Sequence, residues 1–269
     1  MGRPPAGRGG GVTMGTDELL DIAGEAARTA GALLVERFGS ERVLATKSTP
    51  TDVVSEADLA AERAIRELLA ARAGDDAIMG EEGEDVAGTT GRRWIVDPLD
   101  GTVNFLYGIP QWCVSVACED ADGRGLAGVV YDPVRDETFA ATAGGAATLN
   151  GDELRPGGAN GLATALVATG FGYDPDRRAL QAEVVSRVLP RARDIRRGGA
   201  AALDLAWCAA GRVDAYYERG VNPWDVAAGA LVCARAGLRV ERLEPTGALP
   251  WGILAAPEGW ADELRALVA

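Results

Sequence analysis

The chain of 269 residues contains no histidine. This absence excludes Ser-His-Asp and Cys-His nucleophile systems, zinc catalysis that depends on imidazole ligands, and phosphohistidine chemistry. Any general base must instead be a carboxylate, a lysine, a tyrosine or a water molecule bound to a metal ion.

Basic residues are scarce beside acidic ones, with 27 Lys+Arg against 40 Asp+Glu and a formal charge of −13. Nucleic acids and anionic membranes are bound by surfaces rich in Lys and Arg, so we expect neither as a partner. An anionic substrate needs another source of attraction, and a divalent cation is the obvious candidate. No apolar run approaches the length of a membrane span.

Cysteine is sparse too, and Cys113, Cys118, Cys208 and Cys233 are too few for a disulfide scaffold. They lie in apolar runs, which is typical of reduced thiols in the core of a cytoplasmic protein. The first fourteen residues contain no apolar segment of the kind that signal peptides require. We therefore expect residues 1–15 to form a disordered leader.

The composition that remains, 47% hydrophobic and 25% charged residues, is that of an ordinary globular protein. Hydrophobic spacing predicts two helices and then antiparallel strands in the first half, and alternating strands and helices in the second. The predicted helices lie at residues 16–38, 56–69, 177–189, 200–210, 223–236 and 260–268, and the predicted strands at 77–79, 94–96, 113–118, 128–131, 138–142, 165–169, 213–217, 238–240 and 253–255. We expect one α/β domain over residues 16–269, a layered sandwich with two sheets and sub-lobes of about 16–150 and 151–269.

The most informative segment is an apolar run, residues 94–96, that leads straight into Asp97-Pro98-Leu99-Asp100-Gly101-Thr102. Pro98 cannot extend a hydrogen-bonded ladder, so both acids are predicted at the C-terminal end of a strand. Residues 100–102 are typical of a helix start, where free backbone N–H groups suit an anion. Carboxylates for a hard cation beside amides for a phosphate are what metal-assisted phosphoryl chemistry requires. The same residues also fit a plain strand–turn–helix with Asp100 as the N-cap.

Three further acidic segments lie at strand ends or helix starts. Glu81 follows a short strand and a glycine, a placement that aims its side chain at the sheet end, whereas Glu84 and Asp85 are expected to be solvated. Asp225 and the acids of residues 52–58 fit helix caps as well as ligands. Together these acids form the ligand set of an all-oxygen magnesium site.

Rival phosphatase motifs are missing or unusable. A haloacid-dehalogenase nucleophile needs Asp-x-Asp, but Asp97 and Asp100 are three residues apart. Cys118 and Cys233 each precede an arginine at Cys-x5-Arg spacing, yet the first loop is acidic and the second closes a helix, so neither forms a thiolate cradle. No Gly-x4-Gly-Lys-Ser/Thr loop is present.

With these residues in view, the sequence resembles the inositol monophosphatase family from about residue 17 to residue 240. Residues 97–105, DPLDGTVNF, resemble its DPxDGTxNF motif, residues 222–229 resemble its WDxAAG motif, and residues 80–83 resemble its GEE motif. Residues 47–58 are similar to its lead-in segment. Four motifs in the right order are a far stronger indication than any one of them.

The resemblance implies a five-layer αβαβα sandwich of the sugar phosphatase type and a homodimer. It implies a cytoplasmic, magnesium-dependent and lithium-sensitive phosphoric monoester hydrolase that carries two or three Mg²⁺ ions and is inhibited by Li⁺. The expected substrate is a small phosphate monoester, inositol 1-phosphate or a similar polyol phosphate. Metal-activated water would release the alcohol and inorganic phosphate from it.

The resemblance also implies a role for each site residue. Glu81, Asp97 and the Leu99 carbonyl would hold the first metal, and Asp97, Asp100 and Asp225 the second, with a weaker third ion at Glu81. Glu81 and Thr102, with Asp52 behind Thr102, would orient and deprotonate the attacking water. The phosphate would bind the amides of Gly101 and Thr102. The rest of the substrate would contact Asp100, Gly199, Ala200, Ala201, Glu218 and Asp225, with Glu218 on a sugar-like hydroxyl.

Departures from the family pattern leave the substrate open. Position 200 is Ala where the family often has Ser or Thr, and residues 255–257 are Ala-Ala-Pro where Ala-Ser-Asn is common. Related branches act on histidinol phosphate, fructose 1,6-bisphosphate or 3′-phosphoadenosine 5′-phosphate, and Asn104-Phe105 favours the inositol branch. A phosphatase for histidinol phosphate or fructose 1,6-bisphosphate, and a catalytically idle binding module, stay as alternatives.

Overall fold

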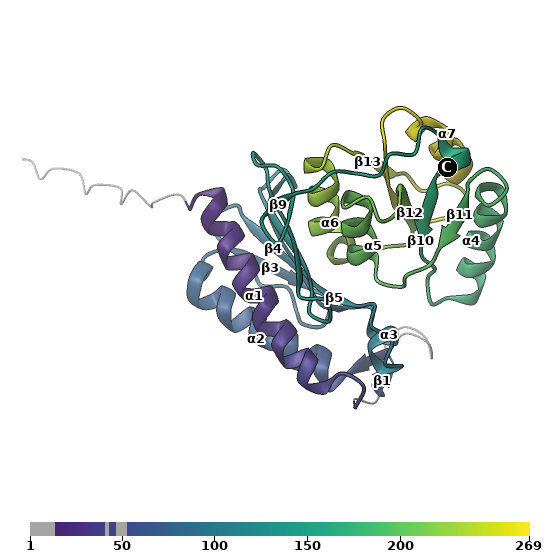
Figure 1. Ribbon diagram of the computed structural model, residues 1–269. Helices are drawn as coiled ribbons and strands as arrows, with labels where there is room; N and C mark the ends of the chain where they lie inside the picture. Colours follow the sequence, from purple (N-terminus) through teal and green to yellow (C-terminus); the bar gives the residue numbers. More distant parts are fainter. Residues whose placement is uncertain (1–13, 41–42, 47–52) are drawn as a thin grey trace, which may run out of the picture.

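The structure, a computed structural model, describes residues 14–40, 43–46 and 53–269. Its layers follow one another as helices, sheet, helices, sheet, helices (Figure 1). The helices are α1 (Thr16–Arg37), α2 (Glu56–Ala73), α3 (Thr102–Leu106), α4 (Pro175–Val188), α5 (Ala201–Ala209), α6 (Pro223–Arg235) and α7 (Ala261–Val268). The predicted α/β sandwich is confirmed.

The strands belong to three sheets. The first half contributes β1 (Val43–Thr46), β2 (Val53–Ser55), β3 (Ala77–Gly80), β4 (Arg93–Asp100), β5 (Cys113–Glu119), β6 (Gly125–Asp132), β7 (Glu137–Thr142), β8 (Thr148–Leu149) and β9 (Asp152–Glu153). The second half contributes β10 (Leu166–Thr169), β11 (Asp194–Arg196), β12 (Ala215–Arg219), β13 (Arg239–Leu243) and β14 (Gly252–Ala256). β1 pairs with β2 in a small antiparallel sheet that the sequence did not predict.

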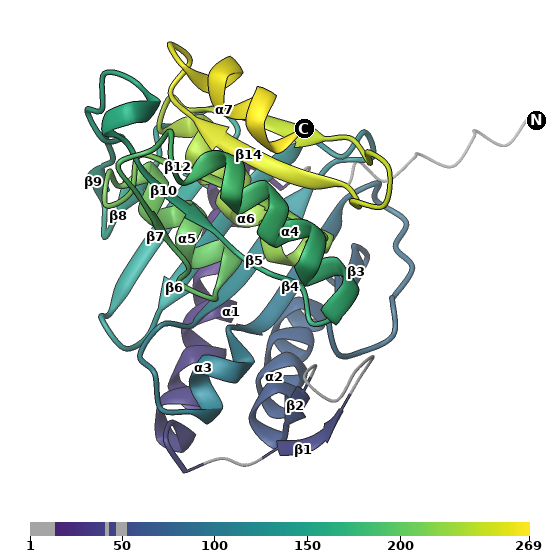
Figure 2. The same cartoon turned by 90° about the vertical axis from the view of Figure 1, so that its right-hand side faces the viewer.

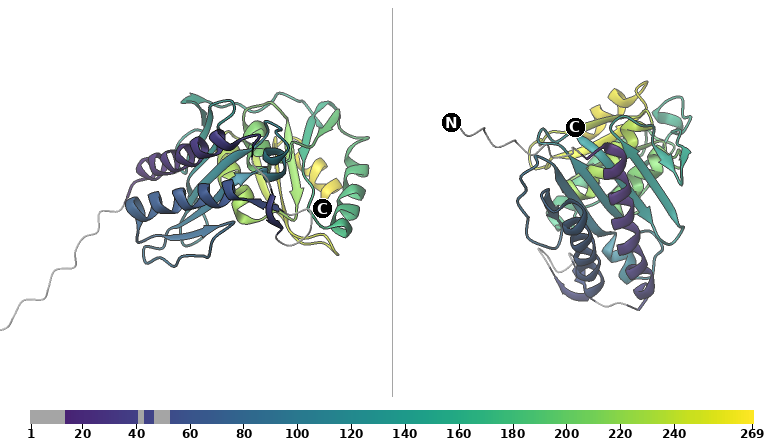
Figure 3. Two further views of the ribbon diagram at one scale, coloured as in Figure 1. Left: turned by 90° about the horizontal axis from the view of Figure 1, so that it is seen from below. Right: turned by 90° about the vertical axis from the view of Figure 1, so that its left-hand side faces the viewer.

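The seven-stranded sheet runs β3-β4-β5-β6-β7-β8-β9, with β3 and β4 parallel and the other neighbours antiparallel. Its side chains alternate between two cores, as the two-residue period of a strand requires. Trp94 and Val96 of β4 pack against α1 and α2, while Ile95 faces α5 and α6. Figure 3 shows α1 and α2 lying across the outer face of this sheet.

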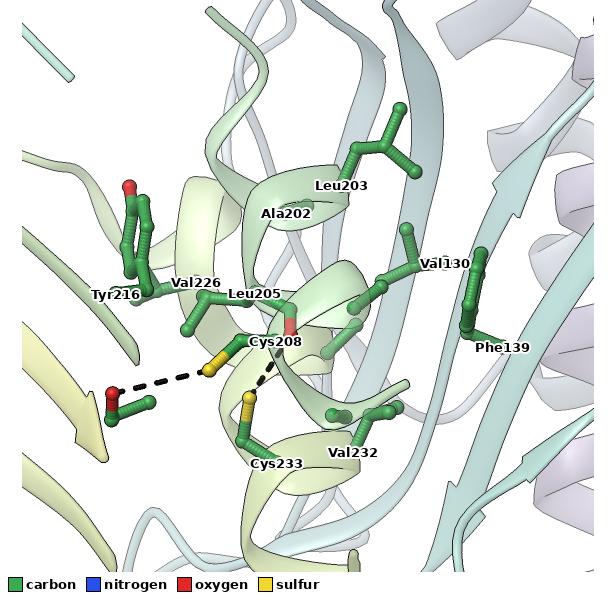
Figure 4. Packing of buried hydrophobic residues seen from close by; sticks show 14 of the residues in the cluster. Val130, Phe139, Ala202, Leu203, Leu205, Cys208, Tyr216, Val226, Val232 and Cys233 are labelled. Atoms are coloured by element: carbon green, nitrogen blue, oxygen red, sulfur yellow. Dashed lines mark hydrogen bonds between the residues drawn. The ribbon is translucent and has the colours of Figure 1, made fainter. Parts of the chain in front are cut away.

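α5 and α6 form the middle layer and are buried between the two sheets. Figure 4 shows this packing, with Cys233 Sγ donating to the Leu205 carbonyl at 3.1 Å and Cys208 Sγ donating to the Ala255 carbonyl at 3.9 Å. All four cysteines are buried and free. The predicted reduced core thiols are therefore confirmed.

The five-stranded sheet runs β11-β10-β12-β14-β13. Tyr216 faces the middle layer, and Tyr217 faces the outer layer of α4 and α7 that Figure 2 shows in front of the sheet. Of the expected leader, residues 1–13 lie outside the described residues, and Met14 packs against the core beneath α1. Over the ranges that the structure describes, no helix has both the length and the apolarity of a membrane span.

Candidate active site

A cavity of about 380 Å³ opens beside the ends of β4 and β12 and the starts of α5 and α6. Elements from both halves of the chain contribute to its wall, so residues far apart in sequence meet there. Among the residues that line it are the predicted Glu81, Asp97, Leu99, Asp100, Gly101, Thr102, Gly199, Ala201, Glu218 and Asp225.

A bulge at the end of β4 turns two acids toward the same side. Asp97 pairs with Ser115 and Asp100 pairs with Cys113, so three steps along β4 match two steps along β5. In a regular strand, residues three apart point to opposite faces, and the extra residue cancels that reversal. Pro98 was expected to end the ladder, but pairing resumes at Asp100, because only the bulged residues lose their bonds. The sequence correctly placed both acids at the end of the strand.

The segment after the bulge is fixed by a glycine and by α5. Gly101 has a φ of +95°, the left-handed region that favours glycine, and α3 begins at the next residue. Asp100 Oδ2 accepts a hydrogen bond of 2.7 Å from the Ala202 amide in the first turn of α5. That amide and the positive end of the helix partly compensate the buried charge of Asp100.

Asp225 reaches the cavity from the first turn of α6. Its Oδ2 accepts a 2.6 Å hydrogen bond from the Asn222 amide, which closes the capping box at the start of the helix. The helix-cap interpretation and the ligand interpretation of this residue are therefore compatible. One carboxylate oxygen caps the helix while the side chain lines the cavity.

Thr102 is held from behind by α2. Its hydroxyl is 2.9 Å from Asp58 Oδ1 and 3.1 Å from the Leu99 carbonyl, both of which are acceptors. The other oxygen of Asp58 accepts from the Ser55 amide at 2.9 Å and from the Ser55 hydroxyl at 2.6 Å. Asp58 is fully buried, so this capping box fixes the acceptor that orients the Thr102 hydroxyl.

Burial and mutual repulsion raise the pKa of the clustered carboxyls. The pKa of Asp97 lies well above its usual value, first because of desolvation and then because of the charges of Glu81, Asp100 and Asp225. Burial likewise raises the pKa of Asp225, and it raises the pKa of Asp100 to about 7 although the amides of Ala202 and Ala201 oppose it. A cation at this end of the cavity would relieve the repulsion.

The chemistry of this donor set fits a hard divalent cation, which prefers carboxylate and carbonyl oxygens. Among the described residues, no three Asp, Glu or Cys side chains already lie close enough together to hold a metal ion.

Comparison with known proteins identifies the family. A model described as "Inositol monophosphatase family" matches residues 16–268. The Mycobacterium tuberculosis protein named Inositol-1-monophosphatase SuhB is 44% identical over 262 residues, which cover 91% of this chain and 90% of that protein. This chain belongs to the inositol monophosphatase family. It is therefore a phosphatase of a metal-dependent family, as predicted.

Other members of the inositol monophosphatase family carry different names. The Pseudomonas aeruginosa protein named Nus factor SuhB is 42% identical over 228 residues, covering 81% of this chain and 83% of that protein. The crystal structure of the extragenic suppressor protein suhB from Bartonella henselae has a TM-score of 0.85 at 35% identity and covers 93% of this chain and 98% of that one. The likeness extends over the whole fold.

Two predicted site residues are not among the described residues that line the cavity. Asp52 lies outside the described residues, and the carboxylate that meets Thr102 is Asp58. Ala200 does not line the cavity; its methyl group lies where it would be 3.2 Å from a Cβ at Gly101. Ala200 thus stands behind the glycine, and its neighbours Gly199 and Ala201 face the cavity.

Sequence reasoning missed two arginines of the cavity wall, Arg177 and Arg197. Arg177 lies in the first turn of α4, and Arg197 directly follows β11, a three-residue strand that was also missed. Neither position has a motif around it. Arg197 is close enough to Glu218 that its charge lowers the pKa of that carboxyl, which burial raises more strongly.

Proposed function

We propose that this member of the inositol monophosphatase family uses Mg²⁺ to hydrolyse inositol 1-phosphate, or a similar polyol phosphate, to the alcohol and inorganic phosphate. The observation that carries the proposal is the convergence of Asp97, Asp100, Asp225 and the Thr102–Asp58 pair on one cavity, with Glu218 in the same wall.

The acidic end of the cavity would hold the cofactor. Glu81, Asp97 and the Leu99 carbonyl would bind one Mg²⁺, Asp97, Asp100 and Asp225 a second, and Glu81 a weaker third. Mg²⁺ bound there would supply positive charge that activates water and stabilises the attacking and leaving oxygens. Li⁺ is expected to inhibit, as the family resemblance implies.

The protein's own groups would prepare the attack. The Thr102 hydroxyl donates toward Asp58 or the Leu99 carbonyl, so its oxygen is free to accept a hydrogen bond from the incoming water. Asp58 can then take up the proton that passes through Thr102, and Glu81 can accept the second hydrogen bond of that water. The amides of Gly101 and Thr102 would bind the phosphate. We expect no covalent intermediate, because the described residues of the cavity wall include no activated nucleophilic side chain.

Glu218 would recognise the alcohol. The Tyr216 hydroxyl donates a 2.6 Å hydrogen bond to Glu218 Oε2, and Oε1 has no hydrogen-bond donor among the described residues. This arrangement leaves one fixed acceptor for a substrate hydroxyl. Gly199 and Ala201 would complete the contact surface around the ring.

A second candidate substrate class is favoured by Arg177 and Arg197. Both guanidinium groups line the cavity, and neither forms an ion pair within the ranges that the structure describes. Arginine is well suited to bind phosphate through paired hydrogen bonds. A sugar bisphosphate such as fructose 1,6-bisphosphate is therefore the alternative, ahead of histidinol phosphate.

A panel of phosphate-release assays tests the proposal. Inositol 1-phosphate, fructose 1,6-bisphosphate and histidinol phosphate would be compared with and without Mg²⁺, and with added Li⁺. We expect Mg²⁺-dependent release that is fastest for inositol 1-phosphate. Undiminished release after exhaustive chelation would overturn the metal assignment. Release from none of the esters would favour the binding-module alternative, which the relatives named Nus factor also suggest.

We also propose that the protein is a homodimer. Tyr107 is 80% exposed and Ile109 is 46% exposed just after α3, and Val134 is 40% exposed next to Arg135, whose guanidinium donates to the Pro110 carbonyl. Such an apolar patch is typical of an interface. Light scattering would test the homodimer: we expect a dimer for wild type and a weakened dimer for Tyr107→Asp. A monomeric wild type would contradict the proposal. A cytoplasmic location stays a prediction.

A further inference from the structure

The turn that carries Glu81 is bound at both ends by other elements. On one side, the Glu81 amide donates to the Val96 carbonyl of β4 at 3.2 Å. On the other side, the Glu82 amide donates to Glu62 Oε2 at 2.7 Å and the Gly83 amide donates to Glu62 Oε1 at 2.8 Å. Glu62 belongs to α2 and is 2% exposed, so both of its oxygens are used on two consecutive amides of this turn.

Arg66 forms an ion pair with Glu62 and also donates a hydrogen bond to the turn. Its Nε donates to Glu62 Oε1 at 2.6 Å, and its Nη1 donates to the Glu84 carbonyl at 2.9 Å. The contact is close: a Cβ at Gly80 would lie 2.4 Å from Glu62 Oε1, and one at Gly83 would lie 2.8 Å from the same atom. The glycines on either side of Glu81-Glu82 thus leave room for the buried ion pair.

The spacing along α2 places two such supports on one face. Asp58 orients Thr102, and Glu62 lies one helical turn later, at i+4, where it holds the turn of Glu81. Glu62 does not line the cavity. Its carboxylate acts through the backbone of the turn.

We propose that Glu62 is a positioning residue for the metal end of the cavity, because its carboxylate fixes the turn from which Glu81 reaches the cation. This inference rests on the proposed function for the identity of the cation. The hydrogen bonds of Glu62 to the turn involve only groups of the protein itself. Groups that orient ligands in this way typically change metal affinity by about 10- to 100-fold when they are removed.

The experiment compares Glu62→Gln with Glu67→Gln in the full chain. Both variants remove one negative charge from α2, but Glu67 is exposed and makes no hydrogen bond or ion pair in the described part of the protein. Exchange of the Glu82 and Gly83 amides would be followed by NMR in metal-free protein. Mg²⁺ affinity would be measured by calorimetry, and KM and kcat with inositol 1-phosphate at saturating Mg²⁺.

In Glu62→Gln we expect both amides to exchange about tenfold faster and Mg²⁺ to bind about tenfold more weakly. The loss of activity should be small at saturating Mg²⁺, because the turn can still reach the cation once the cation is bound. We expect kcat within about threefold of wild type and an unchanged KM for the ester. Glu67→Gln should match wild type in every measurement. A folded Glu62→Gln protein with unchanged exchange, or with unchanged Mg²⁺ affinity, would overturn the inference.

If Glu62→Gln does not fold, Gly83→Ala tests the same contact by changing the turn instead of α2. Its new Cβ would press on Glu62 Oε1 and on Arg66 Nε, which would lie at 2.9 Å, so the turn should move away from α2. We expect the same weakening of Mg²⁺ binding and the same faster exchange at Glu82, and unchanged values would equally overturn the inference. If wild type binds no Mg²⁺, the proposed function fails, while the exchange comparison still tests the hold on the turn.

Discussion

Two acids in this protein serve both the fold and the candidate site with one carboxylate. Asp225 caps α6 through Oδ2, and Asp58 caps α2 through Oδ2 while Oδ1 accepts from Thr102. This double use explains why the sequence left cap and ligand as alternatives for such residues. Both interpretations require an acid at the third position of a helix, and the choice depends on what lies opposite in space.

Replacing Asp225 with Asn separates the two tasks. The amide oxygen can still accept from the Asn222 amide, so the cap should survive, but one charge of the cation site is lost. We expect phosphate release at saturating Mg²⁺ to fall at least about 100-fold. The melting temperature in EDTA should stay or rise, because a buried charge that repels Asp100 has gone. Asp97→Asn should behave alike, and near-wild-type turnover in either variant contradicts the metal assignment.

Glu218 and Tyr216 should affect how the alcohol part of the substrate binds, and they should have little effect on hydrolysis of the phosphate ester. In Glu218→Gln the fixed acceptor becomes neutral, so KM for inositol 1-phosphate should rise about 10- to 100-fold, while a small aryl phosphate should be little affected. Tyr216→Phe removes the 2.6 Å bond that orients Glu218 and should give a smaller change in the same direction. Steady-state kinetics on both esters measure this. Equal losses on the two would remove Glu218 from the substrate pocket.

At the scale of elements, α2 is the part of the fold that connects helix capping to catalysis. Its first turn holds Thr102 through Asp58, and its second turn holds the Glu81 segment through Glu62. The buried side of the helix packs on the seven-stranded sheet, so these groups are carried by a rigid element.

A pair of variants at the start of α2 distinguishes the cap from the proton path. Ser55→Ala and Asp58→Asn both damage the capping box, and each should lower stability by about 1 kcal/mol. Asp58→Asn also removes the proton acceptor behind Thr102, so kcat should fall about 100-fold or more. Ser55→Ala keeps that acceptor, and kcat should stay within about tenfold of wild type. Denaturant unfolding and phosphate release measure the two effects. Equal kcat values would place Asp58 outside the reaction.

Long elements were predictable from the sequence because apolar periodicity and caps identify them. The helices that became α1, α2 and α4 to α7 follow from such patterns, as do the main strands of both sheets. β1, β2, β8, β9 and β11 have two to four residues each, too few to show a period. Five layers became predictable only through the family resemblance, since spacing alone indicated just two sheets.

The candidate site was predictable where motifs mark it and not where contacts cross the chain. The motif around Pro98 predicted Asp97 and Asp100 at the end of one strand, but it did not predict the bulge that turns both acids toward the same side. Asp58 and Thr102 are 44 residues apart, and nothing in the spacing of residues 52–58 says which acid faces Thr102. Arg177 and Arg197 reach the cavity from two separate segments of the second half, so only the fold brings them together.

For the whole molecule, the buried acids make stability depend on pH and metal together. Asp100 has a pKa of about 7 and Asp204 of about 8 in the folded protein, against a usual value of 3.8, and the pKa values of Asp97 and Asp225 are raised as well. The folded protein therefore binds more protons than the unfolded chain between about pH 4 and pH 8. Stability rises with pH only where the unfolded chain binds more protons, so these groups make it fall across this range.

We accordingly expect the melting temperature in EDTA to drop by several degrees from pH 5 to pH 8. Mg²⁺ pairs with the ionised acids, so its stabilising effect should be small at pH 5 and largest at pH 8, with protons released on binding near pH 7. Repulsion within this acidic chain, whose formal charge is −13, also lowers stability as the pH rises. Asp100→Asn separates this general repulsion from the titration of the buried site acids, because it removes one titrating group of the site and only one charge. Its melting temperature in EDTA should depend less on pH than that of wild type. A metal-free melting temperature that rises from pH 5 to pH 8 would contradict this account, because the acids would then be charged and satisfied without a cation.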